Sequence, residues 1–162
     1  MSASATDTRV RAATHEDLPA IVAAVGDLLI ELGSRPPRSS EMLQTAQALL
    51  EEPRCGALLL AEADAENGVA VVGVLSASYQ LALHVPGRYA LIQDLWVHSS
   101  RRGRSVGRAL LAALFELARG QGMARVEVGL PRESFEGIRA TEGFYVHNGF
   151  EHLGARMRRI LT

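Results

Sequence analysis

Lysine is absent from this chain of 162 residues, and all 17 of its basic residues are arginine. The absence excludes a Schiff-base lysine and a lysine general base, because arginine keeps its proton in proteins. The single cysteine, Cys55, excludes an intramolecular disulfide and a metal site built from several cysteines. We therefore expect a protein without a disulfide framework and without a bound metal.

Long apolar runs and an excess of charge of one sign are also missing. The longest apolar runs, Val69–Leu75 and Ala109–Phe115, are far shorter than the roughly 20 residues that a membrane-spanning helix needs. The net charge of −1 gives the whole chain no attraction to nucleic acid or to an anionic membrane. The first residues lack the basic and apolar stretches of a secretory signal. These observations predict a cytoplasmic protein that binds neither nucleic acid nor membrane.

Apolar periodicity predicts one α/β domain around a mixed sheet. We expect residues 1–8 to be disordered and residues 9–162 to form a single domain. Spacings of three and four residues predict helices from Leu18 to a stop at Gly33, from Ser39 or Ser40 to a stop before Pro53, from Val106 to Gly120, and over Phe135–His147. Strands are expected at Arg9–Ala13, Ala57–Ala63, Val69–Gln80, Tyr89–Val97, Arg125–Gly129, Phe150–Leu153 and Ala155–Leu161. The resulting order is β-α-α-β-β-β-α-β-α-β-β.

The most informative segment is the loop between the strand that ends at Val97 and the helix that begins at Val106. Four arginines lie within eight of its residues: Arg101, Arg102, Arg104 and Arg108. The first amides of a helix have no partner within the helix, and Gly103 and Gly107 allow a ligand to approach the backbone closely. This combination predicts a site for a phosphorylated ligand, above all a pyrophosphate. A Walker loop is excluded because the chain has no lysine. Solvated surface arginines remain the alternative.

Three stretches, in this order, carry a family resemblance. Arg102-Gly103-Arg104-Ser105-Val106-Gly107 matches the pattern of arginine or glutamine, two residues, glycine, one residue, and glycine or alanine, except that Ser105 replaces the first glycine. Val10–Ile21 is similar to an opening strand and helix, and Glu142–Phe150 contains Phe-Tyr followed three residues later by Gly-Phe. Over residues 9–161 the chain resembles the GNAT superfamily, the general-control-related N-acetyltransferases.

The resemblance implies a three-layer α/β (α+β) fold with a mixed, mostly antiparallel sheet flanked by helices. Its parallel strands Tyr89–Val97 and Arg125–Gly129 would splay apart around the co-substrate acetyl-CoA. Backbone groups of Leu95, Trp96 and Val97 would bind the pantetheine arm. Amides of Arg102, Gly103, Arg104, Ser105, Val106 and Gly107 would bind the pyrophosphate.

The resemblance also implies catalytic residues. Tyr145 falls on the position that donates a proton to the departing CoA thiolate, a role that suits a phenol because it stays protonated at neutral pH. A core aromatic is the alternative interpretation of this residue. For the general base we favour Asp94, with Glu31, His84 and His147 as alternatives.

The acceptor would be a primary amine of a small molecule or of a protein N-terminus, attacking the thioester directly. The resemblance places it near Leu32–Ser40 and Leu81–Arg88, where Arg35, Arg38 and Arg88 would suit a carboxylate or phosphate on the acceptor. No acidic cluster of the kind that a polycation needs is present.

The sequence thus predicts an acetyl-CoA-dependent N-acetyltransferase that forms a homodimer. A catalytically silent acyl-CoA-binding regulatory module is the first alternative. A nucleic-acid-binding domain is the second, although no aromatic residues are interleaved with the arginines of the loop.

Overall fold

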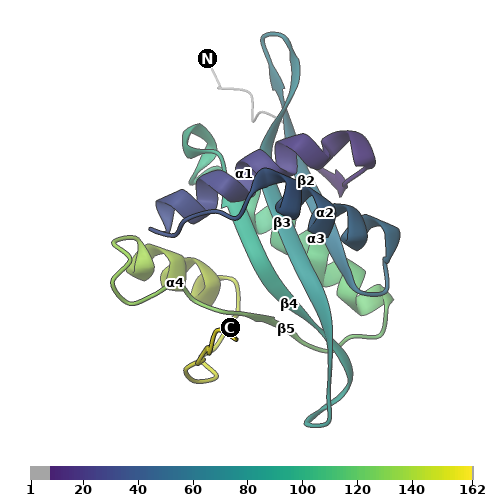
Figure 1. Cartoon of the computed structure of the whole chain (residues 1–162), viewed down its shortest axis with the longest axis vertical. Coiled ribbons are helices and arrows are strands. Elements are labelled where there is room, and N and C mark those ends of the chain that lie inside the picture. The colour runs from purple at the N-terminus through teal and green to yellow at the C-terminus, as the bar shows by residue number, and fades with distance from the viewer. Residues whose placement is uncertain (1–7, 162) are drawn as a thin grey trace.

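A five-stranded sheet in the order β1-β2-β3-β4-β5 forms the middle layer of the computed structural model, which describes residues 8–161 (Figure 1). Its strands are β1 (Arg9–Ala12), β2 (Gly56–Ala65), β3 (Gly68–Ala82), β4 (Val85–Val97) and β5 (Val126–Val128). The first four strands pair antiparallel, and β4 pairs parallel with β5. Residues 1–7, most of the segment expected to be disordered, lie outside the described residues.

Helices cover both faces of the sheet. They are α1 (Leu18–Glu31), α2 (Ser39–Glu51), α3 (Val106–Gly120) and α4 (Ile138–His147), with short 3₁₀ turns η1 (His15–Asp17) and η2 (Ser99–Arg101). In Figure 1, α1 and α2 cross the near face, α3 lies behind the sheet, and α4 lies beside β4 and β5. The predicted three-layer fold with a mixed, mostly antiparallel sheet is confirmed.

Alternation along the strands gives the sheet two separate cores. Leu58, Leu60, Val74 and Trp96 face α1 and α2. Leu59, Leu75, Ile92 and Tyr145 belong to the core that includes α3. Leu110, Leu111 and Leu114 anchor α3 there without any exposed surface, and burying each such side chain is worth about 2 kcal/mol.

A β-bulge interrupts the pairing of β3 with β4. Ser76 is opposite Asp94 and Ala77 is opposite Ile92, so no residue of β3 lies opposite Gln93. The Gln93 side chain donates to the Ser78 hydroxyl on β3 at 2.8 Å. A bulge bends its strand and increases the local twist. The pairing of β4 with β5 ends at the same point, because Ile92 is the last residue of β4 that pairs, with Val128. The two parallel strands therefore separate where the bulge begins.

The last two expected strands are not formed among the described residues. From Gly149 to Leu161 the chain contains no helix or strand, and the side chains of residues 151–161 are exposed. Gly149 and Gly154 have positive φ angles of +88° and +129°, which bend the chain away from an extended path. The prediction of strands at Phe150–Leu153 and Ala155–Leu161 was wrong because charged residues interrupt any apolar face and β5 is only three residues long.

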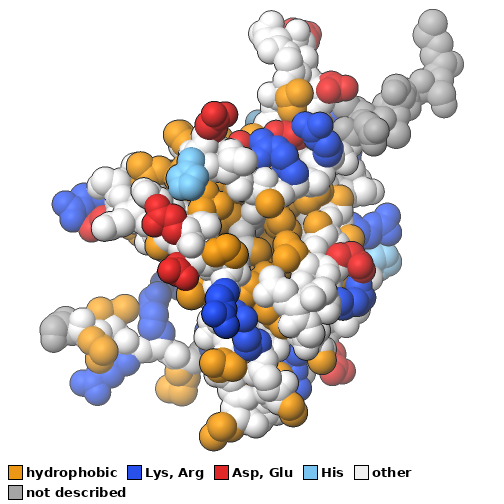
Figure 2. All heavy atoms as spheres, turned by 90° about the vertical axis from the view of Figure 1, so that its right-hand side faces the viewer, with side chains coloured by type: hydrophobic (Ala, Val, Ile, Leu, Met, Phe, Trp, Pro, Cys, Tyr) orange, Lys and Arg blue, Asp and Glu red, His pale blue; other side chains and the backbone are white. Residues whose placement is uncertain are grey.

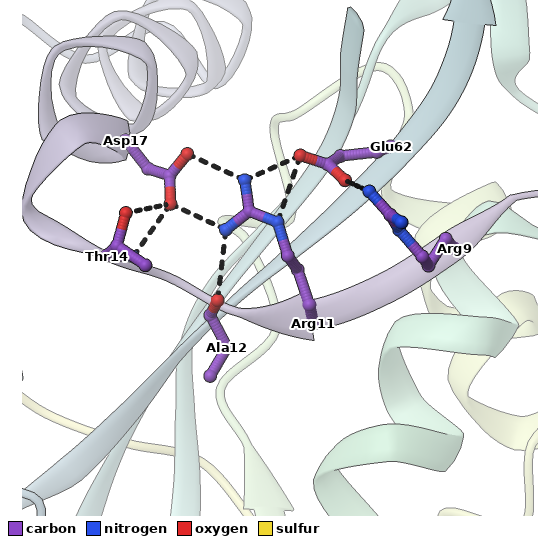
Figure 3. A network of polar contacts seen from close by, with 6 residues as sticks. All are labelled: Arg9, Arg11, Ala12, Thr14, Asp17 and Glu62. Carbon is purple, nitrogen blue, oxygen red and sulfur yellow. Dashed lines mark hydrogen bonds and ion pairs between the residues drawn. The ribbon is translucent and has the colours of Figure 1, made fainter. Parts of the chain in front are cut away.

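An ion-pair network joins the N-terminal strand to the rest of the fold (Figure 3). Arg11 bonds both Asp17, at 2.7 and 2.9 Å, and Glu62, at 2.5 and 3.0 Å. Arg9 adds a bond of 2.7 Å to Glu62, and the Thr14 amide donates to Asp17 at 2.7 Å. The Arg11 guanidinium holds the pKa of both carboxyl groups below their usual range. The network fixes β1 and the start of α1 against β2.

Candidate active site

The edge of β4 beyond the bulge is open. The His98 amide bonds the Val72 carbonyl at 2.9 Å, so in the antiparallel pair the backbone groups of Trp96 also point to β3. Those of Leu95 and Val97 point to the opposite edge, where β5 has already separated from β4. Of the three residues expected to bind pantetheine, two thus present backbone groups to this edge, while Trp96 contributes a buried ring on the α1 face.

The loop after β4 ends in a cluster of free amides. Within residues 8–161, the amides of Gly103, Ser105, Val106, Gly107 and Arg108 have no intramolecular acceptor. The Arg102 amide donates to Ser99 at 3.4 Å, and the Arg104 amide to Arg101 at 3.3 Å, both in long turn contacts. These free amides at the N-terminus of α3 suit an anion. All of these amides except that of Arg108 are among the six that the sequence analysis assigned to pyrophosphate.

Ser105 has an unusual backbone. It is the one non-glycine residue with positive φ in the described part of the chain, at +65°, and it precedes α3 without making a capping hydrogen bond. A left-handed conformation costs a residue with a Cβ about 1–2 kcal/mol. Ser105 stands where the family pattern has glycine, so the backbone keeps the glycine-like turn although the side chain does not favour it.

Gly107 serves a close contact between two helices. A Cβ on Gly107 would lie 3.0 Å from Cζ of Phe144 in α4 and 3.8 Å from Cγ2 of Val97. The free amides of α3 are thereby placed next to the residue that precedes Tyr145. The predicted role of this glycine in admitting a ligand is thus joined by a packing role.

The Arg102 side chain binds the protein itself. It donates to both carboxylate oxygens of Glu31 at 2.7 and 2.8 Å and, through Nε, to the Val97 carbonyl at 3.1 Å. The interaction links the end of α1, the end of β4 and the loop. Arg102 is therefore a positioning residue for the loop, and Glu31, one alternative general base, is occupied by it.

Asp94 lies on the α1 face of β4, next to Ser76 on β3. The Ser76 hydroxyl donates to Oδ2 of Asp94, and both residues line a cavity between α1, α2 and the sheet. Burial raises the pKa of Asp94, and the hydrogen bond from Ser76 opposes this shift. A carboxylate of raised basicity facing a cavity can accept a proton from an incoming ammonium group. The other candidate bases, His84 and His147, are exposed on the hairpin tip and at the end of α4.

Tyr145 lies on the other side of the sheet from Asp94. Its ring packs edge-on against Phe144 and Phe150, with centroid distances of 5.2 Å in both cases. The Tyr145 hydroxyl makes no hydrogen bond through its side chain to residues 8–161. Every fully buried side-chain N or O atom among these residues has a hydrogen-bond partner, so Oη of Tyr145 is not fully buried and is accessible to solvent. Burial raises the pKa of Tyr145 to about 12. The ring is part of the core, and its hydroxyl is protonated and available.

Residues 8–161 contain neither a metal-ligand cluster nor a helix suited to a bilayer. No group of three or more His, Cys, Asp or Glu side chains there could hold a metal ion, and no helix there has the length and apolar character to cross a bilayer. On the face shown in Figure 2, acidic and basic side chains are interspersed around exposed apolar groups.

Comparisons with known proteins agree with this geometry. Residues 24–152 match the family model described as the acetyltransferase (GNAT) family. A proposed acetyltransferase of Arthrobacter sp. FB24 has a similar structure (TM-score 0.75, 27% identity, 99% of each chain covered). So do a possible acetyltransferase of Clostridium difficile 630 (0.76, 17%, 96% of this chain and 98% of that one) and a predicted acetyltransferase of Clostridium acetobutylicum solved with acetyl-CoA (0.75, 15%, 95% and 96%). A search of curated protein sequences finds no match.

Proposed function

The chain belongs to the GNAT family of acetyltransferases, and from this premise we propose that it transfers an acetyl group from acetyl-CoA to a primary amine of a small molecule or of a protein N-terminus. The observation that carries the proposal is the continuity of the open β4 edge with the free amides at the start of α3. An extended ligand with an anionic end fits such a path, because backbone groups along the edge can bind its amides and the helix start can bind its phosphates.

Residues of the chain divide the binding of acetyl-CoA between them. Leu95 and the Val97 amide would bind the pantetheine arm, since Arg102 already occupies the Val97 carbonyl. The amides of Gly103 and of Ser105 to Gly107 would bind the pyrophosphate. The exposed Arg104 adds positive charge beside these amides. When bound, acetyl-CoA supplies a thioester whose C–S bond breaks as the amine forms the new C–N bond.

Two side chains would move the protons of this transfer. Asp94 would take a proton from the ammonium group, so that a neutral amine attacks, and Tyr145 Oη would give a proton to the departing thiolate. Two observations support these roles: Asp94 faces the cavity between α1 and α2, and Tyr145, on α4, packs on the other side of the sheet. The amine and the thiol would thus occupy opposite sides of the β4 edge.

Calorimetric titration with acetyl-CoA tests the donor site, with free CoA and ATP as controls. We expect acetyl-CoA and CoA to bind with a Kd below about 1 mM. Arg104→Glu should weaken binding of acetyl-CoA about 10-fold by placing negative charge beside the pyrophosphate. Arg119→Glu is the matched control at the far end of α3, and it should leave the Kd within about twofold of the unaltered protein.

Thiol release with primary amines then separates an enzyme from a silent acyl-CoA-binding module. Binding without thiol release for any amine would favour the silent module, and binding of duplex DNA with no effect of CoA would favour a nucleic-acid function. A cytoplasmic location and a homodimer remain predictions from the sequence, and gel filtration with light scattering tests the second.

A further inference from the structure

The cavity that Asp94 faces has an apolar wall. It measures about 400 Å³ and lies between α1, α2 and the sheet, and nine of its 13 lining residues are apolar. Ile21, Val25 and Leu29 come from α1, and Met42 and Leu49 from α2. Cavities that bind small molecules measure about 300 to 1,000 Å³. The volume of this cavity therefore suits a small molecule and not the surface of a folded protein.

The few polar groups of the cavity differ in whether they are free to bind a ligand. Glu41 lines it but is occupied at the start of α2, where it bonds the Arg38 amide at 3.1 Å and the Arg38 guanidinium at 2.7 Å. Thr45 donates its hydroxyl hydrogen to the Glu41 carbonyl at 3.1 Å. Asp94 has Ser76 as its partner but no basic side chain, and no Arg or His lines the cavity. One carboxylate is thus available for a cation, and nothing is available for an anion.

We propose that the acceptor is a small amine with one cationic group and an apolar body, such as an alkylamine or an arylalkylamine. The inference rests on the proposed function and names the substrate class of that same site. The ammonium group lies against Asp94, and the hydrocarbon body lies between α1 and α2. A polyamine would bury cations without partners, and an acceptor with a carboxylate would bury an unpaired anion, so both are disfavoured.

The proposed cavity lies largely outside the two segments that were expected to hold the acceptor. Of Leu32–Ser40 and Leu81–Arg88, only Pro37 lines the cavity. Arg38 is bound to Glu41, and the Arg88 guanidinium lies over the Tyr79 ring, 5.3 Å from its centroid. An arginine-bound carboxylate or phosphate on the acceptor is therefore not favoured by this cavity.

A series of amines tests the proposal through thiol release. From n-butylamine to n-hexylamine, kcat/KM should rise about threefold or more with each added methylene. Two matched compounds, 6-aminohexanoate, which adds a carboxylate to the far end, and spermidine, which adds cations, should react at least 10-fold less well than n-hexylamine. Equal rates along the series, or a preference for spermidine, would overturn the proposal.

Two neighbouring residues of α2 provide a variant and its control. Met42→Glu places a charge in the cavity wall, whereas Leu43→Glu alters an exposed side chain outside it. We expect Met42→Glu to lower kcat/KM for n-hexylamine at least 10-fold and Leu43→Glu to change it less than twofold. Both variants should bind acetyl-CoA as the unaltered protein does, which shows that they are folded.

Calorimetric titration of n-hexylamine into the protein, with and without saturating CoA, separates the two proposals. If acetyl-CoA binds and another amine releases thiol while n-hexylamine neither binds nor reacts, the transferase stands and the apolar acceptor is excluded. If acetyl-CoA does not bind, the proposed acetyltransferase activity is excluded. The titration of n-hexylamine still tests whether the cavity binds an apolar amine. Binding that Met42→Glu abolishes and Leu43→Glu retains supports the proposed ligand class, and absence of binding overturns it.

Discussion

Ser76 and Asp94 lie directly opposite each other on β3 and β4, and the serine hydroxyl donates a hydrogen bond to the carboxylate at the cavity wall. Burial raises the pKa of Asp94 and this hydrogen bond lowers it. If Asp94 is the general base, activity requires its ionised form, so kcat/KM should rise with pH through this raised pKa. The acid limb of the pH–rate profile reports that value.

Substitution at these two positions tests the assignment. Ser76→Ala removes the opposing hydrogen bond, so the midpoint of the acid limb should move to higher pH. Asp94→Asn should lower kcat/KM by about 10²–10³-fold, with acetyl-CoA binding unchanged. Its Tm should stay equal or rise, since the variant no longer buries a charge. A pH profile unchanged by Ser76→Ala would exclude Asp94 as the titrating base.

Tyr145→Phe should separate catalysis from packing. The ring contacts with Phe144 and Phe150 remain, and the hydroxyl makes no side-chain bond within the described chain, so Tm should not change. We expect kcat to fall about 10²-fold because the thiolate loses its proton donor. With a pKa of about 12, Tyr145 stays protonated up to about pH 11, and an alkaline limb below that pH should have another origin. An unchanged kcat would reduce Tyr145 to a core residue.

The pair of Arg102 and Glu31 predicts coupled effects on donor binding. Arg102→Gln and Glu31→Gln should each weaken acetyl-CoA binding about 3–10-fold, because the loop loses its link to α1 and β4. The double variant should be no weaker than the weaker single variant. Arg38→Gln, which breaks an exposed pair on α2, serves as the control. Additive losses in calorimetry would argue that Arg102 contacts acetyl-CoA independently of Glu31.

Ser105→Gly should stabilise the protein. Glycine adopts the left-handed conformation without strain, but it loses more conformational freedom on folding than serine does. The net gain in the free energy of unfolding should be about 0.5–1 kcal/mol. For a chain of this size the rise in Tm is roughly 2–4 °C per kcal/mol. Ser105→Ala should match the parent protein, because alanine keeps the Cβ and the serine makes no capping bond to lose. Thermal denaturation of the parent protein and the two variants measures both differences. If Ser105→Ala raised the Tm as much as Ser105→Gly, left-handed strain would not be the cause.

Arg11→Met should destabilise the fold by about 2–3 kcal/mol, since Asp17 and Glu62 keep their burial without their common partner. The lowered pKa values of these carboxyl groups have a second consequence. Their contribution to stability is complete above about pH 5 and is lost as pH falls through the lowered values. Urea denaturation as a function of pH should show a smaller loss in acid for Arg11→Met than for the parent. Arg119→Met, in an exposed pair, should follow the parent profile.

Local patterns predicted much of this molecule, because periodicity and turn residues act over short distances. The four helices and the hairpin at Asn67-Gly68 are confirmed, and the loop after Val97 opens into α3 as expected. The bulge at Gln93 was not predicted, since a single extra residue leaves no mark on a strand that already mixes polar and apolar residues. The pairing of Arg102 with Glu31 spans 71 positions and is equally invisible to local patterns.

The acceptor cavity could not be predicted for the same reason. Met42 and Val25 belong to two amphipathic helices, and apolar spacing alone marks both as core residues. Only the packing of α1 and α2 over the sheet shows that these side chains surround a space. The sequence could propose Asp94 as a base but could not say what the residue faces.

The unpaired Gln93 gives β4 a position whose presence matters more than its identity. Its side chain is exposed, so most substitutions there leave both cores intact. Because the bulge adds one residue without changing the faces of Ile92 and Asp94, deletion of Gln93 would also keep every core side chain in place. Deletion would, however, straighten β4 where it leaves β5. A scan of point substitutions would therefore pass over Gln93, whereas a scan of single-residue deletions would identify it as the residue at which β4 leaves β5.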